Sequence, residues 1–445
     1  MPLKNLNKPF GKTLTIRQQG LSASIVAIMF VFPSVSEATN GYFAHGYGAR
    51  SKALAGATTA LPQDALAAAN NPAGTAYVGD RLDAEIELFS PRRKYTVTGT
   101  PTLAPGAFPL DSGTVESDSE WFPVPALGWS HKIDAQQSVG IVLYGNGGMN
   151  TDYVAKANPL CPPGSQGTGT FCAGTTGIDK AQAFIVPSYA HSFSDGKFSL
   201  GIAPIFAVQR FKARGLNSFA PFSSDPNHLS NQGYDYSYGG GVRVGALAEL
   251  LPGLRLGASY KSRVFMSKLD KYAGLFAEQG GFDIPESFNF GLAWDINSQI
   301  TTSFDVEHIR YSQINSVNNP LLPNLAISKL GSNGGAGFGW EDMTIFKLGT
   351  QWKQNELWTW RAGISYGEQP IPSSEVLFNI LAPGVQEFHL TTGFSRAIGK
   401  DDELSFAFMY SPTNSVKGAN PLSPSQNIEL EMDQLSLQLG YSRRF

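Results

Sequence analysis

Charged residues are scarce in this chain, and neither sign is in marked excess. Asp, Glu, Lys and Arg make up 16% of the 445 residues, and the formal net charge is −3. This balance gives no electrostatic basis for binding nucleic acid, so we expect no nucleic-acid partner. The few basic runs, such as Arg92-Arg93-Lys94, are short and are expected at strand ends.

Long apolar runs are absent after residue 38, which argues against a transmembrane helix in the rest of the chain. The first 38 residues instead have the three zones of a secretory signal peptide. They are a basic start, an apolar run from Leu21 to Val35, and small residues at Ser36-Glu37-Ala38. A membrane-anchoring helix is the alternative, but the apolar run is shorter than the roughly 20 residues that span a bilayer.

Cysteine is also rare, with only Cys161 and Cys172 in the Pro/Gly-rich segment CPPGSQGTGTFC. After export to an oxidising compartment, two close cysteines in a loop predict a disulfide. No second cysteine or histidine pair has the spacing of metal ligands, so we expect neither a metal nor a cofactor.

Glycine (48 residues) and aromatic residues (12%) are abundant, which is typical of many strands and turns with rings at a membrane interface. The chain ends in LSLQLGYSRRF, where apolar and polar residues alternate. Period two predicts a strand with one apolar face. We expect Leu435, Leu437, Leu439 and Tyr441 to face lipid, with Tyr441 and Phe445 near the periplasmic interface.

Alternating segments from Arg81 onward are separated by connections that are short and long in turn. Six tight turns and seven long loops give thirteen connections, and so fourteen strands. The loops are expected at about 100–120, 149–181, 213–233, 268–285, 314–342, 370–385 and 414–431. An even strand number with this layout predicts a closed antiparallel transmembrane β-barrel over residues 81–445, which we expect to be a monomer. A soluble β-sandwich is disfavoured because the strands exceed the usual ~5–6 residues.

Residues 39–80 lack the alternation of a spanning strand and are rich in Gly and Ala. Within them, PQDALAAANNPAG predicts a short helix, with Pro62 and Asp64 at its start and Asn70-Asn71-Pro72 at its end. We expect this segment to pack inside the lumen as a hatch. A flexible leader is the alternative.

Two regions carry a resemblance to a known family. GYGARSKALAGATTALPQDALAAANNPAG is similar to the N-terminal hatch of the FadL-like outer-membrane transporters of long-chain fatty acids and aromatic hydrocarbons. Trp358 to Ser395 is similar to late strands of that family and the loop that joins them. The Phe terminus resembles the signal recognised by outer-membrane assembly machinery. The resemblance implies a fourteen-stranded barrel, a hatch in its lumen and an opening in the wall beside a kinked third strand.

Several residues take expected roles from this resemblance. Gly145, Gly147 and Gly148 suit a kink in the third strand, Ser138 to Gly148, although they could simply begin the next loop. Asn71-Pro72-Ala73 would border the wall opening on the hatch side. Tyr42 and Phe43 are expected to occupy or gate a ligand pocket.

Two loops suggest where a ligand could first be captured. Leu269, Tyr272, Ala273 and Phe276 have helical spacing and predict an amphipathic helix whose apolar face forms an outer hydrophobic groove. The candidate partners for a carboxylate are basic residues nearby in the sequence. They are Arg210, Lys212, Arg214, Lys268 and Lys271, for which a solvated or lipopolysaccharide-facing role is equally supported.

Two motifs imitate enzyme sites. Gly363-Ile364-Ser365-Tyr366-Gly367 fits the nucleophile-elbow pattern, but it lies inside an alternating strand rather than at a strand-to-helix turn. The glycine string from Gly331 to Trp340 has no preceding strand and no clear following helix, as a phosphate-binding loop would require. We therefore expect no enzyme activity.

The function that the resemblance implies is passive uptake of hydrophobic small molecules across the outer membrane, with long-chain fatty acids favoured. Aromatic-hydrocarbon uptake is the alternative within the family. A general porin is a further alternative, although its lumen should be open and lined by charge. The expected partners are the ligand, outer-membrane lipid and lipopolysaccharide, and the assembly machinery through the C-terminal strand.

Overall fold

The strands of the chain form one antiparallel sheet in the computed structural model, which describes residues 39–104 and 106–445. The predicted signal peptide, residues 1–38, lies outside the described residues. The strands are β1 (Arg81–Gly99), β2 (Gly113–Glu116), β3 (Phe122–Lys132), β4 (Gln137–Asn150), β5 (Gly177–Phe193), β6 (Phe198–Arg214), β7 (Asp235–Leu251), β8 (Leu254–Lys261), β9 (Phe265–Met266), β10 (Ser287–Asp295), β11 (Ile300–Ile309), β12 (Met343–Lys353), β13 (Trp358–Gly367), β14 (Phe388–Ala397), β15 (Asp402–Asn420) and β16 (Ser423–Arg444).

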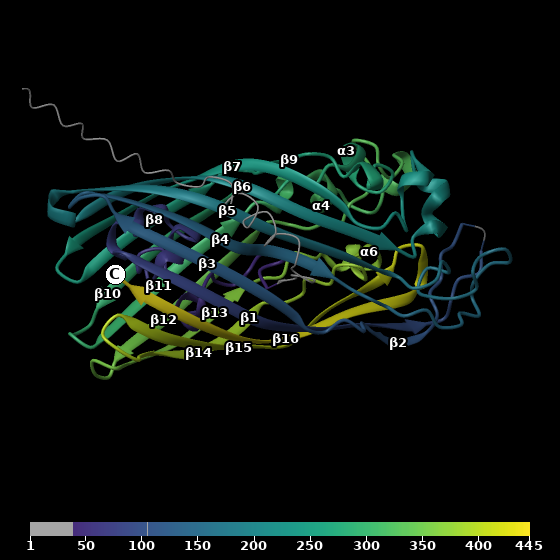
Figure 1. Ribbon diagram of the computed structural model, residues 1–445. Coiled ribbons are helices and arrows are strands. Elements are labelled where there is room, and N and C mark those ends of the chain that lie inside the picture. Colours follow the sequence, from purple (N-terminus) through teal and green to yellow (C-terminus); the bar gives the residue numbers. More distant parts are fainter. Residues whose placement is uncertain (1–38, 105) are drawn as a thin grey trace, which may run out of the picture. The chain divides into compact units, whose positions relative to one another are not determined.

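The sheet closes on itself because the first strand pairs with the last (Figure 1). Residues Arg81 to Gly99 of β1 pair antiparallel with Arg444 to Gln426 of β16. Of the 16 strands, β2 and β9 are short additions outside the ring, so 16 − 2 = 14 strands form the wall. The predicted fourteen-stranded barrel is confirmed. Closure leaves no unpaired sheet edge, which is the condition for crossing hydrocarbon with strands.

The connections alternate as predicted, with one exception. All six tight turns are present, and six of the seven long connections lie close to their expected places. The loop expected at 414–431 is wrong. There β15 and β16 continue as a hairpin up to Asn420 and Ser423, and only two residues join them. The polar residues in this stretch indicated a loop, but they lie on the two paired strands of this extended hairpin.

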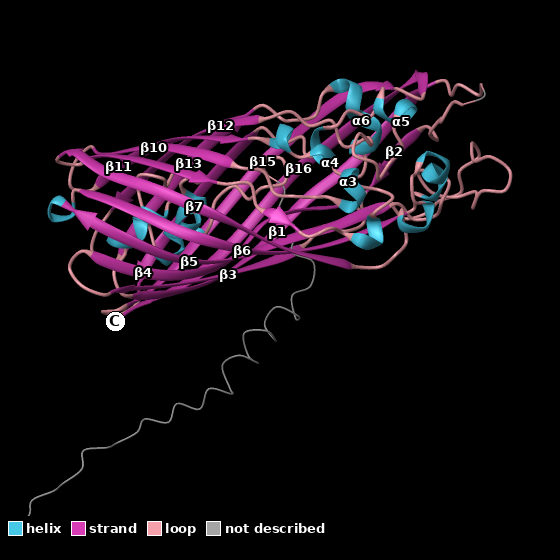
Figure 2. Cartoon of the chain, turned by 90° about the horizontal axis from the view of Figure 1, so that it is seen from above, coloured by secondary structure: helices cyan, strands magenta, loops and turns pink. Residues whose placement is uncertain are grey.

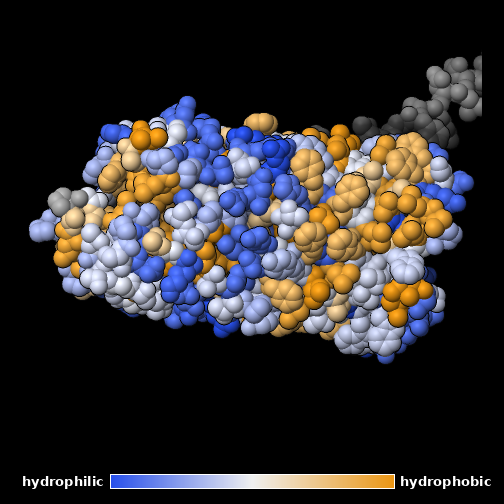
Figure 3. Space-filling view, turned by 180° about the vertical axis from the view of Figure 1, so that it is seen from behind, coloured by the Kyte–Doolittle hydropathy of each residue, from blue (hydrophilic) through white to orange (hydrophobic). Residues whose placement is uncertain are grey.

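Side chains alternate between the lumen and the outside along each wall strand. On β16, Ser436 and Gln438 are buried, whereas Leu439 is 59% exposed and Tyr441 38% exposed. The predicted lipid-facing side of this strand therefore points outward. Figure 3 shows hydrophobic side chains gathered over the half of the barrel that carries the C-terminus, beside a more hydrophilic middle. This pattern is typical of a lipid-facing band.

Residues 39–80, which precede β1, fill the lumen at the turn end of the barrel, where they are purple in Figure 1 and form unlabelled cyan helices in Figure 2. They form α2 (Ala49–Ala53) and the 3-10 helices η1 (Ala65–Ala69) and η2 (Pro72–Tyr77). Asp64 caps η1 by accepting a hydrogen bond from Leu66 N at 3.0 Å, as its place at the start of the predicted helix indicated. We call residues 39–80 the hatch.

Wall glycines let the hatch backbone approach the barrel closely. A Cβ on Gly363 would lie 2.6 Å from Ala55 N, and one on Gly257 would overlap the Thr59 carbonyl. Only glycine fits at such contacts, so the high glycine content reflects hatch packing as well as turns.

The other helices belong to the long loops, apart from the one-turn helix in the tight turn between β5 and β6. They are η3 (Ser194–Gly196), η4 (Asn217–Phe222), η5 (Pro226–His228), η6 (Asp270–Tyr272), α3 (Ala277–Gly280), η7 (Tyr311–Gln313), α4 (Asn315–Asn318), α5 (Asn324–Ile327), η8 (Ser373–Glu375) and α6 (Val376–Asn379). None of the helices in the described part of the chain is long and apolar enough to cross a membrane. The predicted disulfide between Cys161 and Cys172 is confirmed, in the loop between β4 and β5.

Candidate functional site

The start of the hatch adds to β4 at a bulge in that strand. The register between β4 and β5 shifts between Gly145 and Gly147. Beside this shift, Gly148 N donates to Tyr42 O at 3.0 Å and Ala44 N donates to Asn146 O at 3.1 Å. A Cβ on Gly147 would overlap the Tyr42 carbonyl, so glycine at this position permits the contact.

β3 stops pairing with β4 just below the bulge. The last β3–β4 pair is Leu127 with Leu143, although β4 continues to Asn150 and β3 begins at Phe122. Beyond this point β3 pairs with β1 on its other side. The backbone hydrogen bonds that β3 would supply to this stretch of β4 are in part supplied by the hatch.

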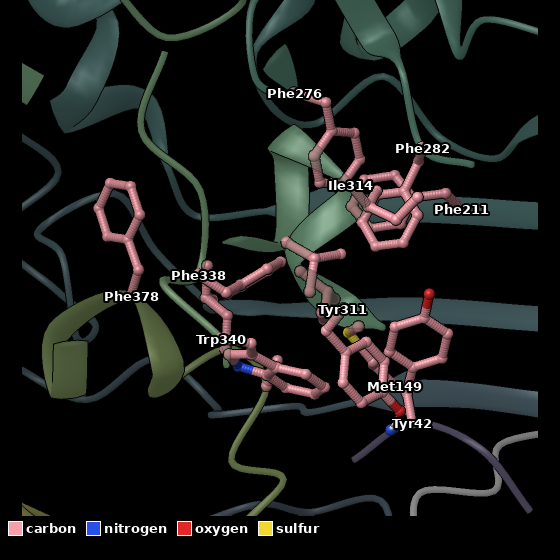
Figure 4. Packing of buried hydrophobic residues seen from close by; sticks show 14 of the residues in the cluster. Tyr42, Met149, Phe211, Phe276, Phe282, Tyr311, Ile314, Phe338, Trp340 and Phe378 are labelled. Atoms are coloured by element: carbon pink, nitrogen blue, oxygen red, sulfur yellow. Dashed lines mark hydrogen bonds between the residues drawn. The ribbon is translucent and has the colours of Figure 1, made fainter. Parts of the chain in front are cut away.

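Aromatic rings surround Tyr42 on the loop side of the hatch (Figure 4). The Tyr42 ring centroid lies 5.2 Å from that of Tyr311, 5.3 Å from Phe43 and 5.9 Å from Trp340. Tyr311 also fixes the backbone, because its hydroxyl donates to Asn40 O at 2.6 Å. Burial of the Tyr42 phenol, together with the nearby Asp283, raises its pKa far above the ordinary value, so it stays protonated.

Two buried lysines reach this ring cluster from the wall. Lys180 Nζ on β5 lies 3.9 Å from the Tyr42 ring centroid and 3.5 Å from that of Phe282. Lys261 Nζ on β8 lies 4.0 Å from the Phe43 ring centroid. Neither Nζ has a hydrogen-bond acceptor among the described residues. Cation–π contact therefore replaces the hydrogen bonds that a buried ammonium group normally makes.

An apolar cavity lies farther toward the loop end of the barrel. Its volume is about 30 Å³, and its lining includes Phe211, Phe219, Phe276, Phe338 and Phe378. A cavity this small has room for a water molecule or two, so a ligand enters only if side chains move. We call it the inner cavity.

Buried ion pairs fix the hatch at the turn end of the lumen. Arg50 lies 2.8 Å from Glu403 Oε1, 3.4 Å from Asp83 Oδ1 and 3.6 Å from Asp64 Oδ2. Lys52 pairs with Glu87, which also accepts a hydrogen bond from Ser436. These charges join the hatch helix α2 to β1, one strand of the closing seam, and to β15. Sequence reasoning did not single them out, because an alternating strand does not show which charges face a lumen.

Comparison with known proteins identifies the family to which this barrel belongs. Residues 36–438 match the sequence profile of the family described as outer membrane protein transport protein (OMPP1/FadL/TodX). The chain belongs to this family. Family membership makes it an outer-membrane transporter of hydrophobic compounds and not an enzyme. No curated protein matches the chain at a significant level.

Solved structures of the OMPP1/FadL/TodX family share the fold. The toluene transporter TodX of P. putida has a TM-score of 0.65 and 16% identity, with 90% of this chain and 99% of that chain covered. A Pseudomonas aeruginosa FadL homologue has a TM-score of 0.66 and 14% identity, covering 91% and 100%. The toluene transporter TbuX of Ralstonia pickettii has a TM-score of 0.59 and 17% identity, covering 90% and 99%.

The hatch residues expected at the wall opening lie in two separate places. Tyr42 and Phe43 contact the β4 bulge, as described above. Asn71-Pro72-Ala73 lies against other strands. Asn71 Nδ2 donates to Ala246 O at 3.0 Å, and Ala73 O accepts from Ser199 Oγ at 3.1 Å. The hydrogen bonds of this tripeptide are thus to β6 and β7 rather than to the β4 bulge at Gly145, Gly147 and Gly148.

The predicted outer hydrophobic groove is also wrong. Leu269 and Tyr272 are fully buried and Phe276 is 4% exposed. The segment is a 3-10 turn followed by the one-turn α3, not an amphipathic helix. Its apolar side chains pack inward, where Phe211 meets the rings of Tyr272 and Phe276 at 4.8 and 4.7 Å. Helical spacing identified residues that share one side but could not tell whether that side faces solvent.

The basic residues proposed as carboxylate partners lie away from the ring cluster and have other contacts. Arg210 lies 3.7 Å from Asp179 and 4.9 Å from the Tyr234 ring, and Lys212 lies 4.6 Å from the same ring. Lys268 pairs with Glu278 and Lys271 donates to Tyr234 O, both at the surface. Lys180 and Lys261 were missed. The apolar residues around Lys180 in GIDKAQAF were the available signal of a buried lysine.

The serine of the nucleophile-elbow pattern lies between two histidines. Ser365 Oγ is 2.9 Å from His45 Nε2 and 3.2 Å from His389 Nδ1. Both rings are buried, and His45 Nδ1 has no acceptor among the described residues, so no carboxylate orients it. Burial and the neighbouring His389 and Lys347 lower the pKa of His45 well below its ordinary value. A structural contact between hatch and wall fits this geometry.

Proposed function

We propose that this protein admits hydrophobic carboxylic acids, with long-chain fatty acids as the favoured ligands, and releases them sideways through the wall beside β4. The observation that carries this proposal is the pair of lysines in the ring cluster. A carboxylate would supply both the hydrogen-bond acceptors and the counter-charge that Lys180 and Lys261 otherwise lack. An alkyl chain would take the place of aromatic contacts around them.

The proposed path connects the ring cluster to the wall through the hatch. Tyr42 and Phe43 belong to the cluster through their rings and to the β4 bulge through their backbone. A ligand that displaces these rings would also loosen the backbone bonds to Asn146 and Gly148. The stretch of wall where β3 and β4 do not pair would then open toward lipid. Movement follows the ligand gradient, since binding and release need no chemical step.

Binding of oleate and toluene to the purified protein tests the carboxylate preference. The double variant Lys180→Met/Lys261→Met should lose about 100-fold or more in oleate affinity, because two charge-assisted hydrogen bonds of ~1.5–3 kcal/mol each are lost. Its toluene affinity should stay the same or rise. Lys268→Met is the matched control, since Lys268 lies at the surface beside Glu278. Equal oleate affinity in the double variant and the wild type would contradict the proposal.

Uptake by cells tests the role of the hatch. Deletion of residues 39–45 removes Tyr42 and Phe43 and should change the uptake of labelled oleate or toluene; unchanged uptake would rule out the gate. Conductance in planar bilayers tests the porin alternative, for which a large steady current is expected. The hatch and the small cavity predict a low current for the intact chain.

A second candidate is uptake of aromatic hydrocarbons. The lining of the inner cavity favours it, because this lining holds twelve aliphatic or aromatic side chains, among them Ile178, Leu216 and Leu229, and no charged one. The structural relatives described as toluene transporters point the same way. A toluene affinity well above the oleate affinity in the wild-type protein would favour this candidate.

A further inference from the structure

The outer face of β6 changes from apolar to basic toward the loop end of the barrel. Burial alternates along this strand, and its even-numbered residues point outward. Leu200 and Phe206 on this face are 46% and 55% exposed, as expected for side chains in lipid. Farther along the strand, the same face carries Arg210, Lys212 and Arg214. We call these three residues the basic stripe.

Two tyrosines of β7 mark the border between lipid and water at the start of the basic stripe. Tyr238 pairs with Val208 of β6, and Tyr236 pairs with Arg210. Both tyrosines point outward, where they are 59% and 46% exposed. Residues that pair directly share one face of a sheet, and aromatic residues on the outside of a barrel gather at the level of the lipid head groups. The basic stripe therefore begins where the phosphate groups of the outer leaflet lie.

A polar pocket opens beside the basic stripe on the same outer face. Its volume is about 160 Å³, and we call it the wall pocket. Asn150 of β4 pairs with Asp179 of β5, and Asp179 pairs in turn with Lys212 of β6. All three residues line the pocket, which thus crosses three neighbouring strands. One water molecule needs only about 10–15 Å³, so the five heavy atoms of a phosphate group fit.

The wall pocket keeps one positive charge without an acidic partner. Arg214 pairs with Asp152 at 2.5 Å, and Arg210, next to the pocket, lies 3.7 Å from Asp179. Lys212 forms no ion pair within the described part of the chain, and its Nζ lies over an aromatic ring instead. Three bases thus face two acids, and the excess positive charge resides on Lys212.

The wall pocket also holds hydrogen-bond donors. Asn150 Oδ1 accepts from Ser119 Oγ at 2.5 Å, which leaves the amide nitrogen of Asn150 as a donor. The guanidinium group of Arg214 has further N–H groups besides those in its ion pair. The ammonium group of Lys212 adds three more donors. Charge-assisted hydrogen bonds from such groups are a usual means by which proteins bind phosphate.

We propose that the wall pocket binds the phosphate group of an outer-leaflet lipid whose acyl chains lie along the apolar face of β6. The pocket supplies a cation and donors for the phosphate, and Leu200 and Phe206 belong to the surface for the chains. β4 lacks β3 as a partner beyond Leu143, so the bound lipid would lie at the outer end of that unpaired stretch. This site lies on the outside of the wall and is independent of the ligand site proposed in the lumen.

Native mass spectrometry of the protein in detergent tests the wall pocket, with bisphosphorylated lipid A and its dephosphorylated form as probes. The wild type should bind the bisphosphorylated form about tenfold more tightly, because the uncharged form loses a charge-assisted hydrogen bond. Lys212→Gln should remove this preference. Lys94→Gln, on the outer face of β1 with Glu431 as its partner at 3.4 Å, is the matched control and should retain it. Equal affinities of the wild type for the two probes, or an unchanged preference in Lys212→Gln, would overturn the site.

Competition with inorganic phosphate separates the two sources of a phosphate group. At the same concentration as lipid A, inorganic phosphate should not displace the lipid, because it has no acyl chains to contact β6. Displacement would show that the wall pocket takes a free anion and would overturn the lipid as its occupant. These measurements contain no transported ligand, so their outcome is separate from that of oleate binding.

Discussion

The Lys180 side chain lies over the Tyr42 ring, with Nζ 3.9 Å from the centroid. The lysine comes from the wall strand β5 and the tyrosine from the hatch, so the contact joins a cation and a ring from different parts of the chain. The contact explains how a lysine without a hydrogen-bond acceptor is tolerated in the interior. Because Tyr42 belongs to the hatch, an anion that draws the Lys180 ammonium group away from its ring would also disturb the position of the hatch.

Lys180→Met should stabilise the ligand-free protein while it weakens oleate binding. A buried polar group without a hydrogen bond costs about 1–3 kcal/mol, and methionine fills a similar volume without that cost. Thermal unfolding in detergent should show a higher midpoint for the variant. Lys212→Met, at a half-buried position over Tyr234, should change the midpoint little. A lower midpoint for Lys180→Met would show that the cation–π contacts outweigh the missing hydrogen bonds.

Arg50→Met should release the hatch from the turn end of the lumen. Loss of this guanidinium removes one of the counter-charges of Asp83, Asp64 and Glu403, and removal of one partner from a buried ion pair costs about 3–5 kcal/mol. Limited proteolysis should cut residues 39–80 faster than in the wild type. The conservative variant Arg50→Lys should restore part of the protection. Equal protection in all three proteins would contradict the role given to Arg50.

Gly147→Ala should separate the start of the hatch from β4. The added Cβ would overlap the Tyr42 carbonyl, and such overpacking costs about 1–3 kcal/mol. Hydrogen exchange of the peptide that contains Ala44 should become faster. Gly240→Ala is the matched control, because its Cβ would have only an ordinary contact, 3.6 Å from Ile205 O. The same exchange rate in both variants would argue against a backbone contact at the bulge.

The contribution of Asp64 to stability should fall as pH rises. Burial and the neighbouring Asp83 raise the pKa of Asp64 from 3.8 to about 6, although Arg50 and Arg81 act in the opposite direction. A raised carboxyl pKa means that the folded state holds the proton more tightly than the unfolded chain. Stability from this group is therefore fully present below about 3.8 and is lost as pH rises through about 6.

Asp64→Asn isolates that contribution, because asparagine keeps the cap on η1 but does not titrate. The unfolding midpoint of the variant, measured relative to the wild type, should rise between about pH 4 and pH 7. A difference between the two midpoints that stays constant with pH would contradict the raised pKa of Asp64.

The barrel could be predicted from the sequence because each strand repeats a local pattern. Alternation, turn residues and strand length fix the number of strands without knowledge of their neighbours. Asp64 and the Asn70-Asn71-Pro72 run marked the ends of a hatch helix for the same local reason. The error at 414–431 arose where Lys417 and Glu429 made a strand look like a loop. These two charges form a cross-strand ion pair at 3.2 Å, which is visible only once the strands are paired.

The site could be predicted only in part because it is made by residues far apart in sequence. Tyr42 and Phe43 were identified through family resemblance, whereas Lys180 and Lys261 were not, since the side that a strand residue faces depends on the register of the whole sheet. Leu269, Tyr272 and Phe276 were correctly grouped as apolar neighbours but were placed on the outside. Local periodicity does not show whether the apolar side of a short loop helix faces solvent or the protein interior.

The pairing of β1 with β16 determines when the barrel can close. The two strands that close the wall, β1 and β16, are the first and the last strands of the described residues, so the sheet can close only when β16 is present. The hatch immediately precedes β1 and is bonded to Asp83 and Glu85 on the inner side of that strand. A barrel that closes without the hatch in its lumen would lack these contacts with Asp83 and Glu85.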